Sequence, residues 1–450
     1  MRTKKRFSLS TTQIILLSFL LAILAGSLLL SLPVAAADGQ RVPYIDALFT
    51  ATTATCVTGL VTVTTATTWS LFGQVVILVL IQIGGLGVIT VVSWLMLLMH
   101  RRLGLKDNLL LQDAFNLNSL SGLAKFVKNV VAGTLIVEGA GAALYMTVFV
   151  PRFGLRGVWI AIFNAVSAFC NAGMDIIGEV SLCDYATHPL VNGVTAALIV
   201  LGGIGYIVWW DVIRVLRTPH KRSWRYLTLH TKIVLTTTAL LIFGGAALLL
   251  AAEYRNPATI GEMGLWDKIQ VALFQSVTTR TAGFATVPQE NFTDVSALIC
   301  TLLMFVGGSP VGTAGGIKTA TLAVLAASAF CTITGRRQVT LFHRNLSPDA
   351  LRKAMAVTGM SFLILFLSTL ALCAAIDAPF LDVLYETASA TATVGLTRGV
   401  TSLLGGWGKL IIIATMYFGR IGPISLAIAL NVRKDNVNAV KNPTEEISVG

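Results

Sequence analysis

Four stretches of this chain follow one pattern, in which an apolar segment of about a dozen residues ends in an extended tail with a glycine. The four stretches are PYIDALFTATTATCVTGL from Pro43, GVWIAIFNAVSAFCNAGMD from Gly157, LWDKIQVALFQSVTTRTAGF from Leu265 and PFLDVLYETASATATVGL from Pro379. In register, their tail glycines are Gly59, Gly173, Gly283 and Gly395. These glycines recur at intervals of 114, 110 and 112 residues. A nearly constant period of this length marks a tandem repeat, so the chain should fold as four similar units.

Each stretch lies between longer apolar segments. Eight of them are long enough to cross a bilayer, which takes about 20 helical residues. They cover approximately residues 11–32, 71–99, 126–150, 190–216, 231–252, 295–332, 351–375 and 403–430. With 55% hydrophobic and 12% charged residues, the chain belongs in a lipid bilayer. The first segment follows a basic N-terminus, but about 22 residues exceed the apolar region of a signal peptide. We interpret it as an anchor, with cleavage near residues 33–37 as the alternative.

The predicted fold is an all-α polytopic membrane protein with four tandem repeats around a central pore. Each repeat consists of a helix, a re-entrant pore helix with its filter strand, and a second helix. The repeats cover residues 1–106, 107–225, 226–345 and 346–436, and a C-terminal tail covers 437–450. All four begin and end on one side, which disfavours an inverted-repeat transporter. Non-helical backbone at membrane depth must line a cavity, so the four tails should line the pore.

Basic residues are concentrated on one predicted face. Of 33 Lys and Arg residues, 23 lie in the N-terminus, around 101–128, 214–232 and 336–353, and in residues 431–450. These regions should be cytoplasmic, together with both termini. The opposite loops hold seven basic and 13 acidic residues and should attract cations. Because the charge of +12 follows helix ends and forms no single patch, we expect no nucleic-acid partner.

Enzymatic chemistry is not indicated. The six cysteines have no CxxC or paired spacing, and neither a His/Cys cluster nor paired catalytic carboxylates occur among the spans. We therefore expect no enzyme and no covalent cofactor. A non-conducting scaffold subunit is an alternative, although a scaffold would not need four glycines in register.

The tails have the composition expected of an ion selectivity filter. A potassium ion that leaves water needs oxygen ligands, and rings of backbone carbonyls can replace its hydration shell. Glycine reaches positive φ without a Cβ penalty and so lets carbonyls point toward one axis. The predicted filter residues are Thr55, Cys56, Val57, Thr58, Gly59, Cys170, Asn171, Ala172, Gly173, Arg280, Thr281, Ala282, Gly283, Ala392, Thr393, Val394 and Gly395. Their backbone carbonyls should bind potassium. Close helix packing is the alternative role for the glycines, and we expect packing or bending at 84–87 and 202–205.

The segment 295–332 is too long for one membrane span. Its 38 residues would measure about 57 Å as a helix, nearly twice the hydrocarbon core. Five glycines and one proline between 307 and 318 predict where it breaks, below the filter. The predicted gate consists of Gly307, Gly308, Ser309, Pro310, Gly312, Thr313, Gly315, Gly316 and Lys318, with Arg420 from the last span. The string GTAGGIKT is not a P-loop, because Ile317 stands where that motif needs glycine.

Three charged residues fall within apolar segments, where a charge usually faces a cavity or a partner. Arg420 follows its tail glycine by 25 residues, which predicts the depth of the glycine-rich break. It should repel cations there and bond loop carbonyls, with a purely structural bond as the alternative. Arg280 should point behind the filter, with Glu386 as a candidate partner and the backbone or solvent as alternatives. Glu138 should bond a neighbouring helix.

The four tails and the glycine-rich break resemble those of the Trk/Ktr/HKT superfamily of cation transporters, most closely the membrane subunits of bacterial Ktr systems. The resemblance covers nearly the whole chain. Eight spans without an additional N-terminal helix pair are similar to Ktr, and Gly59 stands where plant-type sodium-selective members carry serine. The resemblance implies a potassium-conducting homodimer in the bacterial cytoplasmic membrane, with one pore per protomer. It also implies that the break is an intramembrane gating loop and that a cytoplasmic nucleotide-binding ring regulates transport.

Two questions stay open at this point. The tail 437–450 either contributes to the dimer interface or the regulatory contact, or is a disordered terminus. Sodium could act as an activator, and a sodium-permeable or less selective transporter is the alternative function.

Overall fold

The computed structural model describes residues 11–99, 104, 123–218, 224–336 and 338–422. The basic N-terminus and the tail 437–450 lie outside the described residues. The described part is helical apart from loops, short 3-10 turns and one antiparallel hairpin, β1 (Thr340–Leu341) with β2 (Arg344–Asn345).

Each predicted repeat contains a long first helix and a shorter pore helix, as expected. The long helices are α1 (Thr11–Leu30), α7 (Leu123–Phe153), α11 (Leu229–Glu253) and α15 (Pro348–Ala375). The pore helices are α2 (Tyr44–Cys56), α8 (Leu155–Cys170), α12 (Leu265–Thr278) and α16 (Phe380–Ala392). The long helices present large apolar side chains outward, such as Ile136 at 71% and Leu240 at 72% exposed, which is typical of helices that face lipid.

The second helices are broken or short. The break within 295–332 was predicted, and bending was one of the two roles predicted for the glycines at 84–87 and 202–205. The first two are the bent pairs α4 (Leu71–Leu86) with α5 (Val88–Leu98), and α9 (Pro189–Gly203) with α10 (Tyr206–Arg217). The other two are the split pair α13 (Asp294–Phe305) with α14 (Thr319–Ile333), and α18 (Gly406–Ile421). Short helices α3 (Thr65–Thr68) and α17 (Val400–Leu403) precede two of them. Four described helices are long and apolar enough to cross a membrane, or six if each bent pair is one span.

Glycine at positive φ explains the bends. The bent pairs turn by 101° and 98° at breaks that contain Gly87 (φ +86°) and Gly205 (φ +87°). Side chains rarely tolerate that conformation, so only glycine permits the turn at low cost. Gly422 has the same conformation (φ +87°) and ends α18 nine residues before the predicted end of its span. Residues 423–430 of that span lie outside the described residues.

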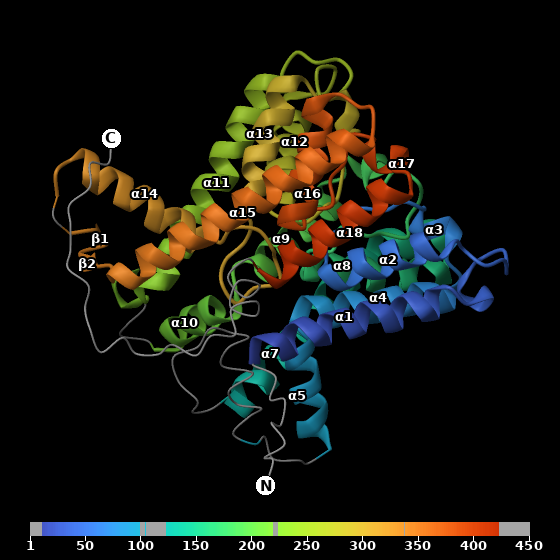
Figure 1. Ribbon diagram of the computed structural model, residues 1–450, viewed down its shortest axis with the longest axis horizontal. Helices are drawn as coiled ribbons and strands as arrows, with labels where there is room; N and C mark the ends of the chain where they lie inside the picture. The colour runs from blue at the N-terminus through green and yellow to red at the C-terminus, as the bar shows by residue number, and fades with distance from the viewer. Residues whose placement is uncertain (1–10, 100–103, 105–122, 219–223, 337, 423–450) are drawn as a thin grey trace, which may run out of the picture.

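The repeats pack in a closed cycle. The second helix of each repeat contacts the pore helix of the next: α4 with α8, α9 with α12, α13 with α16, and α18 with α2. Figure 1 accordingly shows the red C-terminal helix α18 near the blue helix α2, although they lie at opposite ends of the chain. This cycle places all four pore helices around one axis.

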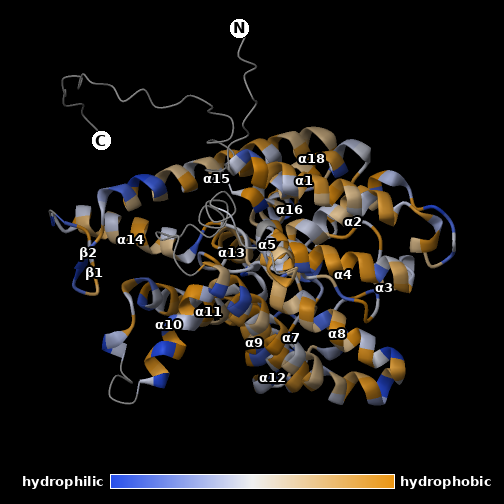
Figure 2. Cartoon of the chain, turned by 90° about the horizontal axis from the view of Figure 1, so that it is seen from below, coloured by the Kyte–Doolittle hydropathy of each residue, from blue (hydrophilic) through white to orange (hydrophobic). Residues whose placement is uncertain are grey.

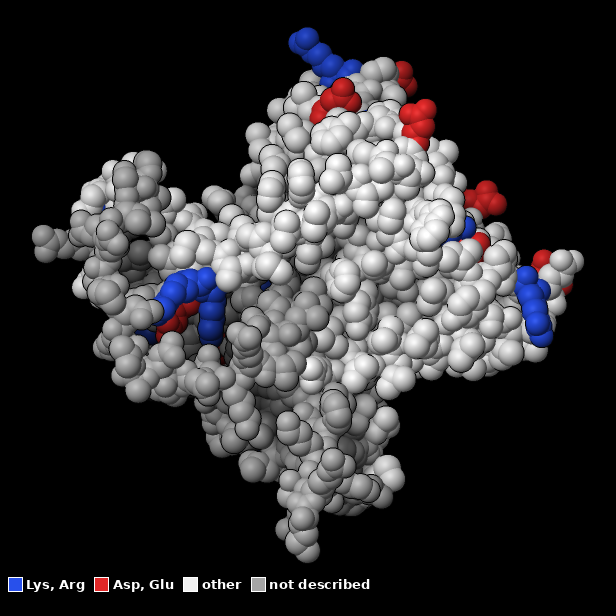
Figure 3. All heavy atoms as spheres, viewed as in Figure 1, with Lys and Arg blue, Asp and Glu red and all other residues white. Residues whose placement is uncertain are grey.

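Polarity follows the same axis. Hydrophilic residues gather near α10 and the β1–β2 hairpin and at the loops of the opposite end, whereas most of the intervening helix surface is apolar (Figure 2). On the face drawn in Figure 3, the described surface in the upper middle is largely uncharged, and the described charges lie toward the top and right edges and in a group at the left. The chain is therefore an all-α polytopic membrane protein.

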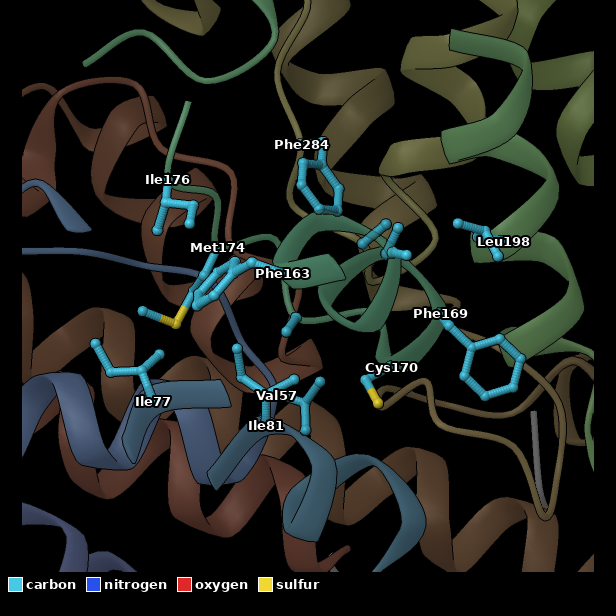
Figure 4. Packing of buried hydrophobic residues seen from close by; sticks show 14 of the residues in the cluster. Val57, Ile77, Ile81, Phe163, Phe169, Cys170, Met174, Ile176, Leu198 and Phe284 are labelled. Carbon is cyan, nitrogen blue, oxygen red and sulfur yellow. The ribbon is translucent and has the colours of Figure 1, made fainter. Parts of the chain in front are cut away.

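The core is continuous with the tails. Buried side chains of the first three tails, Val57, Met174 and Phe284, belong to one apolar cluster with residues of α4, α8 and α9 (Figure 4). Tight packing of this kind holds the irregular tails in one arrangement.

Candidate functional site

The four tail glycines meet in a closed ring. A Cβ atom added to any of them would lie 2.7 Å or less from a carbonyl oxygen of the next tail. The four pairs are Gly59 with Ala172, Gly173 with Ala282, Gly283 with Val394 and Gly395 with Thr58. Any side chain at these positions would therefore force the tails apart, because the obstructing atom is backbone. We call these four residues the glycine ring.

Each tail also contains a predicted filter residue whose left-handed backbone conformation the sequence did not reveal. Two positions before each glycine the backbone is left-handed, with φ between +55° and +66° at Val57, Asn171, Thr281 and Thr393. For β-branched residues this conformation is an outlier that persists only where the surroundings enforce it, at a cost of about 1–3 kcal/mol. Each tail therefore has positive φ at two positions, at this residue and at the ring glycine, and its backbone is neither helical nor extended as in a sheet.

Hydroxyl groups of the pore helices hold the tails in place. The bonds run from Gly59 N to Thr53 Oγ1 (2.9 Å), Met174 N to Ser167 Oγ (3.1 Å), Thr278 Oγ1 to Phe284 O (2.7 Å) and Gly395 N to Ser389 Oγ (3.0 Å). These four hydroxyl residues were missed in the sequence. A signal existed, because Thr53, Ser167 and Ser389 each precede their glycine by six residues.

The glycine-rich loop, residues 306–318, lies directly beneath the ring. It separates α13 from α14 and closes on itself through the bond from Gly307 N to Ile317 O (3.0 Å). A Cβ atom on Gly315 would collide with the Thr393 hydroxyl and lie 2.7 Å from the Ala392 carbonyl oxygen. The predicted break is thus present, and it packs against the fourth tail.

Arg420 joins three repeats at this depth. Its guanidinium donates to the carbonyl oxygen of Thr313 in the loop and to that of Gly84 in α4, each at 2.5 Å. Lys318 donates to two loop carbonyls, those of Ala314 (2.7 Å) and Gly315 (3.4 Å). Both cations line a cavity of about 120 Å³, and none of the described residues that line it is acidic. The space below the loop is therefore electropositive.

A sequence model of the TrkH cation transport proteins matches residues 3–440, which is nearly the whole chain. The chain belongs to the TrkH family. It is 36% identical over 439 residues to the Ktr system potassium uptake protein B of Bacillus subtilis, covering 97% of this chain and 96% of that protein. It is 35% identical over 456 residues to the potassium/sodium uptake protein NtpJ of Enterococcus hirae, covering 100% and 99%.

The crystal structure of the potassium transporter TrkH from Vibrio parahaemolyticus has the same fold. It superposes with a TM-score of 0.75 at 18% identity and covers 96% of this chain and 87% of that one. Members of the TrkH family are cation transporters, so this chain is not an enzyme.

In this TrkH-family chain, Arg280 and Glu386 do not form the predicted ion pair, so that prediction is wrong. Arg280 is buried and lies with Nη2 3.5 Å from the carbonyl oxygen of Gly307. Glu386 is also buried, but it accepts hydrogen bonds from the hydroxyls of Thr397 and Thr401, each at 2.5 Å. The two side chains point in opposite directions along the pore axis. Glu386 points toward the residues that follow Gly395, whereas Arg280 points toward the glycine-rich loop.

Glu138 bonds neighbouring helices, as predicted. Gln82 Nε2 of α4 lies 3.3 Å from its carboxylate, and Cys170 Sγ at the end of α8 lies 3.8 Å away. This polar cluster lies among the helices around the start of the second tail and is not part of the ring.

Asp175 lies two residues beyond Gly173, on the side of the ring away from the glycine-rich loop. Burial raises the pKa of its carboxyl to about 6, although hydrogen bonds from Ser181 and from the backbone amides of Ile177 and Gly178 oppose the shift. This carboxyl therefore changes charge close to neutral pH.

Proposed function

We propose that this chain is the ion-conducting subunit of a potassium uptake system and that the glycine ring forms its selectivity filter. The observation that carries the proposal is the closed contact of four glycines with carbonyl oxygens of neighbouring tails. A ring of carbonyls can replace the hydration shell of potassium, whereas helix packing would not require four irregular tails on one axis. The names of the B. subtilis and E. hirae relatives both include potassium uptake.

The glycine-rich loop and Arg420 are proposed as the gate. In support, the loop lies beneath the ring and the guanidinium bonds its backbone. A unit positive charge about 5 Å from a cation costs about 3 kcal/mol at an effective dielectric constant of about 20. Arg420 and Lys318 would therefore oppose a cation in the closed state. Opening exchanges the bonds of Arg420 to carbonyls for bonds to water.

The partners and the orientation belong to the same proposal. The chain would form a homodimer in the bacterial cytoplasmic membrane, with cytoplasmic termini and a cytoplasmic nucleotide-binding ring as regulator. The description of the B. subtilis relative as part of a Ktr system supports a multi-subunit assembly. The strongly basic segments on one predicted face support the orientation.

The decisive experiment is rubidium or potassium uptake in bacterial cells that lack their own uptake systems, with the regulatory subunit coexpressed and with or without sodium. We expect uptake that rescues growth at low potassium. Absence of uptake at every sodium concentration, in cells that contain the protein in the membrane, would reject the proposal.

A sodium-permeable transporter is the second candidate, because the E. hirae relative is described as a potassium/sodium uptake protein. Competition separates the two functions. In a selective potassium system, excess sodium leaves rubidium uptake intact or activates it, whereas in a shared pathway sodium enters the cells and reduces rubidium uptake.

A further inference from the structure

We propose that Thr313 determines selectivity as well as gating, because its hydroxyl braces the second tail of the filter. We further propose that its half of the glycine-rich loop stays docked on the second repeat when the gate opens. This inference rests on the proposed function and assigns a role to one side chain within it.

The contacts of Thr313 reach the filter directly. Its hydroxyl, which is fully buried, lies 3.1 Å from the carbonyl oxygen of Phe169 and 3.3 Å from Oδ1 of Asn171. The Nδ2 atom of Asn171 in turn lies 3.5 Å from the carbonyl oxygen of Arg280 on the third tail. One hydroxyl therefore fixes the side chain that spans two neighbouring tails.

The second tail, like the third, lacks the bond to its ring-glycine amide that holds the first and fourth tails. In the first and fourth tails the amide of the ring glycine itself is tied to a pore-helix hydroxyl, from Thr53 and Ser389. In the second tail the corresponding bond from Ser167 reaches Met174, one residue further on. The inner half of the second tail is braced by the loop instead, through the side chain of Asn171, whose backbone is left-handed (φ +61°).

The first half of the loop is bound to the second repeat. Ser309 N donates to Gly203 O (2.8 Å), Thr313 N donates to Gly202 O (3.1 Å), and Tyr206 N donates to Val311 O (3.1 Å). The single hydrogen of the Thr313 hydroxyl, shared between its two acceptors, adds to these bonds. Moving residues 309–313 would therefore leave several buried backbone groups without partners, which costs about 1–3 kcal/mol for each group.

The second half of the loop is bound differently. Among the described residues, hydrogen bonds from 314–318 go to residues of the third repeat itself, such as those of Ile317 with Phe305 and Gly307. Its contacts with the fourth tail are van der Waals contacts at Gly315 and Gly316. This half can leave the axis without breaking a bond to another repeat.

Gating and selectivity thus use different atoms of Thr313. Arg420 bonds its carbonyl oxygen, whereas the filter contacts its hydroxyl. Loss of Arg420 should remove its positive charge from the pathway and leave the brace intact. Loss of the hydroxyl should loosen the filter in the conducting state.

The test compares three variants of the full-length protein, reconstituted in liposomes with its regulatory subunit. Thr313→Val removes the hydroxyl at nearly constant volume, and Thr313→Ser retains it. The matched control is Thr301→Val, because the buried Thr301 hydroxyl bonds the carbonyl oxygen of Ala297 within α13 (2.8 Å). The readout is the ratio of potassium to sodium flux, measured together with the absolute potassium flux.

We expect Thr313→Val to lower the flux ratio by about three- to tenfold, the range that follows from the loss of one buried hydrogen bond. Thr313→Ser and Thr301→Val should keep the parental ratio. An unchanged ratio in Thr313→Val would overturn the inference, whatever happens to the absolute flux, and would leave the proposed function intact. If the parental protein itself transports no potassium, the proposed function fails instead.

Asn171→Gly provides a second route should Thr313→Val not fold. Glycine keeps the left-handed backbone and removes the amide that the Thr313 hydroxyl contacts. The same fall in the flux ratio supports the brace, and a parental ratio contradicts it.

Discussion

The guanidinium of Arg420 and the carbonyl oxygen of Thr313 are hydrogen-bonded although they lie 107 residues apart in the chain. The same guanidinium bonds Gly84 O, so one side chain of the fourth repeat connects the loop of the third repeat to the first repeat. A contact of this kind can hold a flexible loop across an axis.

Arg420→Ala should raise potassium flux by about tenfold or more, because it removes two charge-assisted hydrogen bonds and a positive charge from the pathway. Dependence on the regulatory subunit should weaken, while the ratio of potassium to sodium flux stays parental. Arg420→Lys, which keeps the charge but not the bidentate geometry, should give an intermediate flux. If both variants fold and conduct at the parental rate with full nucleotide control, the gate lies elsewhere.

Gly59→Ser should lower the ratio of potassium to sodium permeability, because the new Cβ would lie 2.7 Å from the carbonyl oxygen of Ala172. The other three ring glycines should respond similarly. Gly139→Ser on α7 is the matched control, since a Cβ at Gly139 meets no atom within 4 Å. Reversal potentials under bi-ionic conditions measure the ratio. A parental ratio in Gly59→Ser would remove Gly59 from the filter.

Uptake should fall as the pH on the proposed outer side decreases, because burial raises the pKa of Asp175 to about 6. The carboxyl is ionised above that value and neutral below it, so its attraction for cations is present near pH 7.5 and about nine-tenths lost near pH 5. Asp175→Asn should lack this component and show a flatter rubidium uptake profile across the same range. Parallel pH profiles for the two proteins would contradict the prediction.

Glu386→Ala should destabilise the protein by about 2–4 kcal/mol, because the buried hydroxyl of Thr401 and the half-buried hydroxyl of Thr397 lose their acceptor. Glu386→Gln retains one acceptor oxygen and should cost less. Thermal unfolding in detergent measures both. Arg280 has other contacts. The changes in the free energy of unfolding caused by Arg280→Met and Glu386→Gln should therefore add within about 0.5 kcal/mol in the double variant. Strong coupling between the two sites would restore the ion pair as an explanation.

Deletion of residues 437–450 should weaken the dimer or the response of transport to nucleotide, if the tail contacts a second protomer or the regulatory ring. Size-exclusion chromatography in detergent and nucleotide-dependent uptake are the measurements. A truncated protein with a parental dimer and a parental nucleotide response would indicate that the tail has neither role.

Much of the architecture follows from local patterns. The four glycine-containing tails, the pore helices before them and the break within 295–332 are all readable in the chain, because they depend on period, length and the conformational freedom of glycine. The glycines of 84–87 and 202–205 were also visible as positions of packing or bending. The sequence does not predict the turns of 101° and 98° at these positions, because a glycine permits a turn without requiring one.

Side-chain partners were decided only by the tertiary structure. Asn171 and Thr313 are 142 residues apart, and nothing in their local sequence relates them. The ion pair of Arg280 with Glu386 was suggested by opposite charge, yet the closed cycle of repeats turns the two side chains toward opposite ends of the axis. Periodicity and composition act over a few helical turns and so determine the elements, whereas the contacts between elements depend on the closure of all four repeats into one ring.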